Sequence, residues 1–375
     1  KTGMFIDSVR RQYRQDTFSN NGDVDSSWAG SWNTPWSEVF PQQNHPINQS
    51  QTDISYDGTQ NITAGYVMAD LPLNETFNVV GGVRLENTLM QTTVIPDADA
   101  KWIDTVTQTL QNFSGPNIWD ADFNELRALP MIGFNWNLAD DLVLRTAFAQ
   151  TLARPNFYEM VPVIQYDYIG GPIFIGNPQL GMSSLNNYDV RMDWTPEQNW
   201  LVSGSVFYKT ISDPIQYVNR FTEGFAYTSA INMPSGWLLG VELESRVTLD
   251  PILGEEWKGL ALGGNFTWMA SQVTLDALTT QYLRDYGIND NTQPMTATPE
   301  FLLNLNATYD VELTGTQVGL FYNFKGDSLV SGANPHTTLL TPSIYQLGYG
   351  TLNFTASQAI IGGLRFSAKP RAPRW

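Results

Sequence analysis

Charged residues recur at every second position in several stretches of this chain. Glu242, Glu244 and Arg246 alternate with the apolar residues Val241, Leu243 and Val247, interrupted only by Ser245. Arg191 and Asp193 belong to a similar stretch. A spacing of two places these side chains on one face of a β-strand. Because both signs of charge share that face, internal ion pairs in a polar wall are favoured over a ring selective for one ion. The full set is Arg84, Glu86, Arg145, Asp189, Arg191, Asp193, Glu242, Glu244 and Arg246.

Other chemistry has weaker support. The two histidines, His45 and His336, lie far apart in predicted loops. Neither stands beside a serine at a strand end, as a serine hydrolase would need, so no enzyme activity is predicted. A histidine metal site is less expected than plain exposure of these side chains. No cofactor is predicted, although carboxylates near residues 276–298 or 95–122 could bind calcium; the first of these loops lacks the spacing of an EF-hand.

Aromatic residues in the predicted loops allow two interpretations. They could stack on sugars or other ring-bearing ligands, or they could pack against one another within large loops. These residues are Trp28, Trp32, Trp36, Tyr166, Tyr168 and Phe174.

The elements that must position the charged residues are alternating strands. Tyr188, Val190, Met192 and Trp194 form the apolar side of the stretch that carries Arg191. A soluble sandwich would bury such a face, whereas a membrane barrel turns it to lipid and leaves the charged face lining the interior. About 13 stretches alternate in this way, most of them near the roughly 9–11 residues that cross a bilayer.

Long and short connections alternate along the chain. The long ones lie near residues 19–60, 95–122, 154–186, 212–235, 276–298 and 327–346. This alternation is typical of outer-membrane barrels, whose short turns lie on one side and whose long loops lie on the other. A propeller or a sandwich gives no reason for it. The sequence therefore predicts an all-β, antiparallel transmembrane barrel.

Composition excludes several classes of protein. The chain has 375 residues, a net charge of −17 and no cysteine. The negative charge argues against nucleic acid as a partner and against docking on anionic lipid. The lack of cysteine rules out thiol chemistry and is compatible with the bacterial envelope. No stretch reaches about 18 apolar residues, so no transmembrane helix is expected.

Short motifs point to a family. In order, they are Ala153-Arg154-Pro155-Asn156-Phe157, Gly176-Asn177-Pro178-Gln179-Leu180, Asn187-Tyr188-Asp189 and Phe207-Tyr208-Lys209, with Gly81-Gly82-Val83-Arg84-Leu85-Glu86 before them. In this order the chain resembles the C-terminal part of the β-barrel of TonB-dependent outer-membrane receptors. The positions that carry the motif are Arg154, Pro155, Phe157, Glu159, Asn177 and Pro178.

The resemblance implies a barrel of about 22 strands with a plugged lumen, of which this chain would supply about 13 strands. Residues 1–375 would be the C-terminal part of that barrel, and the plug domain would be absent from this chain. The implied partners are outer-membrane lipid, the plug, the TonB complex and a small-molecule or oligosaccharide ligand. The implied function is active uptake of a scarce solute across the bacterial outer membrane. Arg154-Pro155 is expected to fix loop geometry rather than to contact substrate.

Two alternatives stay open: a passive porin, and a structural barrel subunit of an envelope complex.

The sequence also makes a prediction about closure of the barrel. The last alternating stretch, residues 364–368, is followed by Pro370 and Pro373, each of which lacks a backbone donor. We therefore expect an incomplete barrel, in which residues 3–13 do not pair with residues 364–368.

Overall fold

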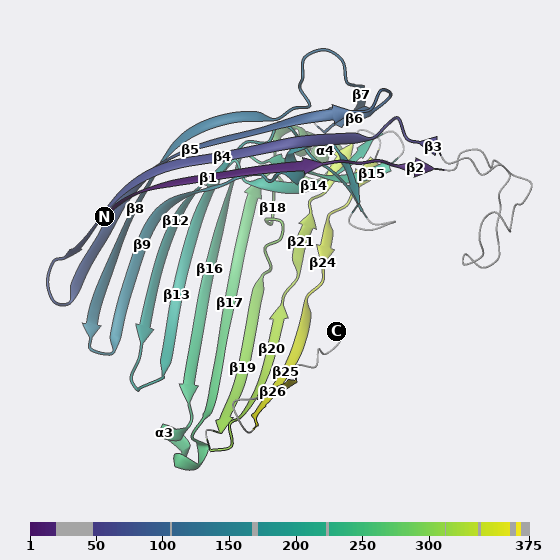
Figure 1. Cartoon of the computed structure of the whole chain (residues 1–375). Helices are drawn as coiled ribbons and strands as arrows, with labels where there is room; N and C mark the ends of the chain where they lie inside the picture. Colours follow the sequence, from purple (N-terminus) through teal and green to yellow (C-terminus); the bar gives the residue numbers. More distant parts are fainter. Residues whose placement is uncertain are drawn as a thin grey trace, which may run out of the picture.

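One large antiparallel sheet dominates the computed structural model (Figure 1). The structure describes residues 1–19, 48–105, 107–166, 172–222, 225–311, 313–336, 339–360 and 365–368. Thirteen strands follow one another across the sheet in chain order: β1 (Thr2–Tyr13), β4 (Ile54–Pro72), β5 (Phe77–Pro96), β8 (Asp122–Ala139), β9 (Leu142–Ala153), β12 (Ser183–Trp194), β13 (Leu201–Ser212), β16 (Ser235–Thr248), β17 (Leu260–Thr274), β19 (Phe301–Val311), β20 (Thr316–Lys325), β25 (Tyr349–Ala359) and β26 (Arg365–Ala368).

The predicted partial, antiparallel all-β architecture is confirmed. In the described part of the chain β1 pairs only with β4 and β26 only with β25, so the sheet is open between β1 and β26. Short turns join neighbouring strands at one end. At one of them the Asn74 side chain accepts hydrogen bonds from the backbone N–H groups of Thr76 and Phe77, at 2.9 and 2.8 Å. Such an Asx turn replaces the ladder bonds that the turn cannot make.

Smaller elements lie in the connections. The long connections contain β2 (Phe18–Ser19), β3 (Asn48–Gln49), β6 (Lys101–Asp104), β7 (Thr109–Asn112), α2 (Phe157–Met160), β10 (Ile164–Tyr166), β11 (Ile173–Ile175), β14 (Ile215–Thr222), β15 (Phe225–Asn232), α4 (Ala277–Asp285), β18 (Thr292–Gln293), β21 (Ser328–Ser331), β22 (Asn334–His336), β23 (Leu339–Thr341) and β24 (Ile344–Gln346). The turn from β16 to β17 holds α3 (Asp250–Leu253) and η1 (Glu255–Trp257). No helix in the described residues is long and apolar enough to cross a membrane.

Strand lengths differ from those predicted at the long-connection end. β4 begins at Ile54, so residues 54–60 are strand and not loop, and β5 continues to Pro96. The two strands have 19 and 20 residues, about twice the length that a bilayer needs. The additional residues at these strand ends, among them Tyr56 and Val94, pack against loop side chains that include Phe157 and Met160. Burial against these loops therefore extends the sheet beyond the length that periodicity alone indicates.

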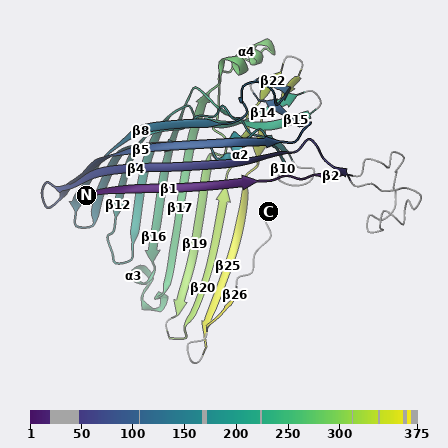
Figure 2. The same cartoon turned by 45° about the horizontal axis from the view of Figure 1, so that its top comes forward.

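The two faces of the sheet differ in chemistry. Register places all nine predicted charged residues on the same face, because Glu86 is opposite Arg127, Arg145 opposite Arg191, and Glu244 opposite Ser203. We call this the inner face, since Phe157 packs on it at Gly58 and α2 lies within the curve of the sheet (Figure 2).

The outer face is apolar. Its exposed side chains include Val190 at 48%, Leu243 at 55% and Leu305 at 47% of their maximal area. Aromatic side chains mark both ends of this band, for example Tyr188 and Trp194 on β12. An apolar band bounded by aromatic residues is the pattern of a surface in contact with lipid.

The long connections all join strands at one end of the sheet, because consecutive strands are antiparallel (Figure 1). We expect protease added to intact cells to cut only within these connections. Residues 313–315, in a short turn, should stay protected until the cells are lysed. Mass spectrometry of the fragments locates the cuts, and cleavage restricted to the short turns would reverse the topology.

Candidate functional site

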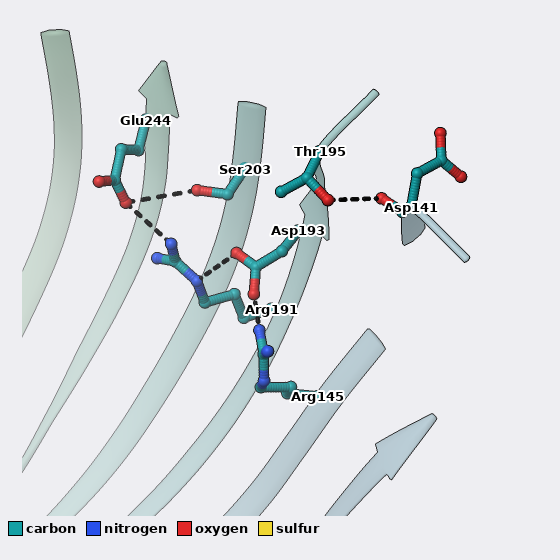
Figure 3. Close-up of polar contacts among 7 residues, drawn as sticks. All are labelled: Asp141, Arg145, Arg191, Asp193, Thr195, Ser203 and Glu244. Atoms are coloured by element: carbon teal, nitrogen blue, oxygen red, sulfur yellow. Dashed lines mark hydrogen bonds and ion pairs between the residues drawn. The ribbon is translucent and has the colours of Figure 1, made fainter. Parts of the chain in front are cut away.

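An ion-pair network on the inner face joins three strands and spans a fourth that lies between them (Figure 3). Arg145 on β9 and Arg191 on β12 are directly opposite, and like charges in that position repel. Asp193 offsets this repulsion because its carboxylate pairs with both guanidinium groups, with 2.7 Å between its Oδ1 and Arg191 Nε. Arg191 Nη2 also donates to Glu244 Oε2 on β16 at 2.8 Å. The network therefore ties β9, β12 and β16 together across the intervening β13.

In the described part of the chain Glu244 does not pair with Arg246, the nearest opposite charge on its own strand. Glu244 instead pairs with Arg191 two strands away and accepts a hydrogen bond from Ser203, at 3.4 Å. Glu242 accepts a hydrogen bond from Ser205 at 3.0 Å. Asp189 and Arg246 are exposed on the same face.

A second network fastens the start of the β9–β12 connection to β5. Glu86 is 5% exposed and pairs with Arg84 and Arg154. Arg154 Nε also donates to Thr88 Oγ1 at 3.1 Å. The Arg84 guanidinium in turn lies 5.0 Å from the ring centre of Phe5. A buried carboxylate with two arginine partners is a strong, specific anchor, so Arg154 holds the loop by its side chain as well as by the proline that follows it.

The motif residues after Arg154 build a small capped structure. Asn156 and Glu159 form a capping box on α2, in which each side chain accepts from the other residue's backbone N–H, at 3.0 and 2.9 Å. Pro155 and Phe157 are buried beside it. The backbone N–H of Asn177 donates to the Glu159 carbonyl at 2.6 Å. These bonds join the two halves of the motif.

Glu159 and Asn177 also hold the neighbouring hairpin, β14–β15. The Tyr217 hydroxyl donates to Glu159 Oε1 at 2.6 Å, and Asn177 Nδ2 donates to the Ala230 carbonyl at 3.1 Å. Pro178, which follows Asn177, is half-buried at this junction. The motif thus fixes how two long connections meet and gives their polar groups internal partners.

The β14–β15 hairpin touches the other connections too. Thr222 donates to the Gln108 carbonyl at 3.1 Å, Thr296 N–H donates to Gln216 Oε1 at 2.7 Å, and Asn219 Nδ2 donates to the Pro342 carbonyl at 2.8 Å. Those three partners belong to the β5–β8, β17–β19 and β20–β25 connections. The assembly that surrounds the hairpin is here called the loop cap, residues 97–121, 154–182, 213–234, 275–300 and 326–348 where described. One hairpin therefore links connections from across the sheet.

Replacing Tyr217 by phenylalanine should loosen the loop cap. Burial first, and the hydrogen bond to Glu159 second, raise the pKa of Tyr217 above its ordinary value of 10. Its contribution to stability is therefore fully present below pH 10 and is lost only as the pH rises through the raised value. Loss of a hydrogen bond to a carboxylate costs about 1.5–3 kcal/mol. Hydrogen exchange in residues 156–165 should accelerate in Tyr217→Phe but not in Tyr208→Phe, on the outer face; equal exchange in both variants would contradict this role.

The aromatic and acidic residues of the loops were candidates for ligand stacking and for calcium binding. Phe174 packs within the loop cap, 4.3 Å from the Tyr158 ring centre and 5.6 Å from that of Tyr217, so it belongs to the self-packing alternative. The side chains of Trp28, Trp32, Trp36, Tyr166 and Tyr168, and those of both histidines, lie outside the described residues. Asp276 caps α4 by accepting from the Thr279 N–H at 2.9 Å. Among the described residues, no three histidine or acidic side chains group as a metal site would require.

Comparison with solved structures finds the same architecture in larger proteins. The ferric yersiniabactin uptake receptor FyuA from Yersinia pestis is 18% identical, with a TM-score of 0.53 over 83% of this chain and 40% of FyuA. The siderophore receptor PiuA from Acinetobacter baumannii is 11% identical, with a TM-score of 0.55 over 88% of this chain and 43% of PiuA. The copper transporter OprC is 12% identical, with a TM-score of 0.53 over 86% of this chain and 42% of OprC.

These likenesses establish the fold, and this chain spans only about two fifths of each neighbour. No curated protein matches the chain significantly in sequence. Residues 2–369, however, match the family described as TonB dependent receptor-like, beta-barrel. Because that match covers nearly the whole chain, the chain belongs to the TonB-dependent receptor β-barrel family.

Proposed function

We propose that this chain is the C-terminal part of the barrel of a bacterial outer-membrane receptor that takes up a scarce solute actively. The observation that carries the proposal is the division of one sheet into an apolar outer face and a charged inner face, with the long connections assembled over one end. The outer face contacts lipid, and the loop cap lies on the cell surface.

In this proposal the two ion-pair networks stiffen the wall against which a plug domain, outside residues 1–375, rests. Energy delivered through TonB shifts the plug and opens a path for the solute. A wall that must keep its shape while its plug is pulled benefits from pairs that join several strands, as Arg191 does between Asp193 and Glu244. Because these charges pair with one another within the barrel wall, they bind the plug less strongly, and the plug can move along the wall.

Energy dependence separates this proposal from a passive porin. We would compare native cells that carry or lack the full-length receptor and analyse solutes depleted from the medium by mass spectrometry and elemental analysis. The expected result is depletion of at least one solute that requires the receptor and disappears when TonB is deleted or a protonophore is added. Receptor-dependent depletion that persists without TonB would favour the porin instead.

A further inference from the structure

Charge is distributed unequally around the inner face. The strands from β5 to β16 carry all the ion pairs described above, whereas β17, β19, β20 and β25 contain only two charged residues, Asp310 and Lys325. Asp310 lies near the short-turn end of β19, and Lys325 ends β20 at the other side. Between them the inner positions are amides, hydroxyls, glycines and a few apolar side chains. We call this surface the neutral wall: Gly263, Asn265, Thr267, Asn304, Asn306, Gly319, Phe321, Asn323, Thr351, Asn353 and Thr355.

A ladder of amides runs across the neutral wall. Asn304 Nδ2 donates to Asn265 Oδ1 at 2.7 Å, and Asn323 Nδ2 donates to Asn304 Oδ1 at 2.5 Å. An asparagine side chain offers two N–H groups and two acceptor lone pairs. In the described structure Asn304 uses one N–H group and one acceptor lone pair in these bonds, which is half of its hydrogen-bonding groups. Asn265 uses one lone pair and Asn323 one N–H group. The ladder is therefore ordered by its own bonds and still has donors and acceptors available to a solute.

The surface beside the ladder is hollowed. A cavity of about 610 Å³ opens near the short-turn end, and Thr308, Asp310, Gln317, Phe321, Thr355 and Ser357 are among the residues that line it. Asp310 is the one charged residue among the described residues of this lining, and its carboxylate accepts a hydrogen bond from Gln317 Nε2 at 2.7 Å. The Phe321 ring lies over Gly319, where a Cβ atom would be 2.7 Å from the ring. An aromatic ring among hydroxyls and amides suits a molecule with both C–H surfaces and hydroxyl groups.

We propose that the solute passes along the neutral wall, and that the solute is an uncharged molecule rich in hydroxyl or amide groups. This inference rests on the proposed uptake function. Passage requires contacts that are favourable yet weak and repeated, because a solute that binds tightly at one point does not leave it. Amides spaced along the wall provide such contacts, whereas the ion-paired wall between β5 and β16 presents fixed charges that are already engaged with one another. The other possible occupant of the neutral wall is the plug itself, permanently in contact.

Single cysteines can test the route, because residues 1–375 contain none. In the full-length receptor, with any other cysteine replaced by serine, we would compare Thr351→Cys and Asn323→Cys on the neutral wall with Ser205→Cys on the charged wall. Thr351 and Ser205 are matched: both are half-buried hydroxyl residues at inner positions. The probes are hydroxyethyl methanethiosulfonate, which is neutral, and sulfonatoethyl methanethiosulfonate, which is anionic. The readout is the labelling rate in cells before and after a protonophore is added, with correct folding checked by heat-modifiable migration in SDS gels.

We expect energised cells to label both neutral-wall cysteines with the neutral reagent at least about tenfold faster than de-energised cells, because the rate follows the fraction of time for which the site is open. Ser205→Cys should change little. Acceleration at Ser205→Cys without acceleration on the neutral wall would overturn the route and leave active uptake standing. Equal acceleration by the anionic reagent would overturn the solute class. Energy-independent labelling at all three positions would remove both this inference and the proposed uptake function.

Discussion

Replacing Glu86 by glutamine should lower the free energy of unfolding by about 3 kcal/mol. Breaking a buried ion pair by removing one partner costs about 3–5 kcal/mol, because the remaining charge is left without compensation. Glu86 is the common partner of two arginines, and its side chain is only 6% exposed. We place the effect at the lower end of the range because Arg84 and Arg154 keep 29% and 23% exposure and can recruit water.

Glu125 offers a matched control for this change. Like Glu86 it pairs with an arginine two residues away on its own strand, but its side chain is 28% exposed and that of Arg127 is 50% exposed. An exposed pair contributes about 0–1 kcal/mol, so Glu125→Gln should be nearly neutral. Urea unfolding of the full-length receptor in lipid vesicles, followed by tryptophan fluorescence, measures both. Similar losses in the two variants would show that Glu86 is not an anchor.

Leu243→Arg should prevent assembly in the membrane far more than Glu242→Arg. These neighbours lie on opposite faces of β16: Leu243 is 55% exposed on the apolar outer face, and Glu242 accepts from Ser205 on the inner face. Arginine at the lipid midplane costs about 2–4 kcal/mol, whereas at position 242 it enters a polar surface. The fraction of receptor that shows heat-modifiable migration in SDS gels reports assembly. If both variants assembled equally well, the assignment of the faces would be wrong.

Much of the fold could be predicted from alternation. The strand through Glu242, Glu244 and Arg246 lies where the periodicity indicates, and the antiparallel order follows from the alternating connection lengths. The partner of each charge could not be predicted in the same way. Arg191 contacts Glu244 across β13. This contact depends on how β12, β13 and β16 are aligned with one another, which the sequence of a single strand does not determine.

Structure inside the long connections was also missed at the sequence level. Residues 154–186 were expected to be loop throughout, yet Asn156 and Glu159 have the spacing of a capping box, which could have indicated α2. Asp276 ahead of α4 is a similar signal. The β14–β15 hairpin has a weaker sequence signal. Its buried Gln216 and Asn219 form their hydrogen bonds with residues of other connections. Long-range polar contacts of this kind have no local pattern.

The central place of the β14–β15 hairpin has a consequence for how this surface can change over generations. The effects of substitutions at contacting residues are not independent, so a change in one segment alters what its neighbours tolerate. Exposed loops vary more in sequence than the elements that they connect. Because residues 215–222 and 225–232 bond to four other connections, variants should arise mainly at tips that lie away from the hairpin. The hairpin would then stay a constant epitope, partly shielded, beneath a changing outer layer.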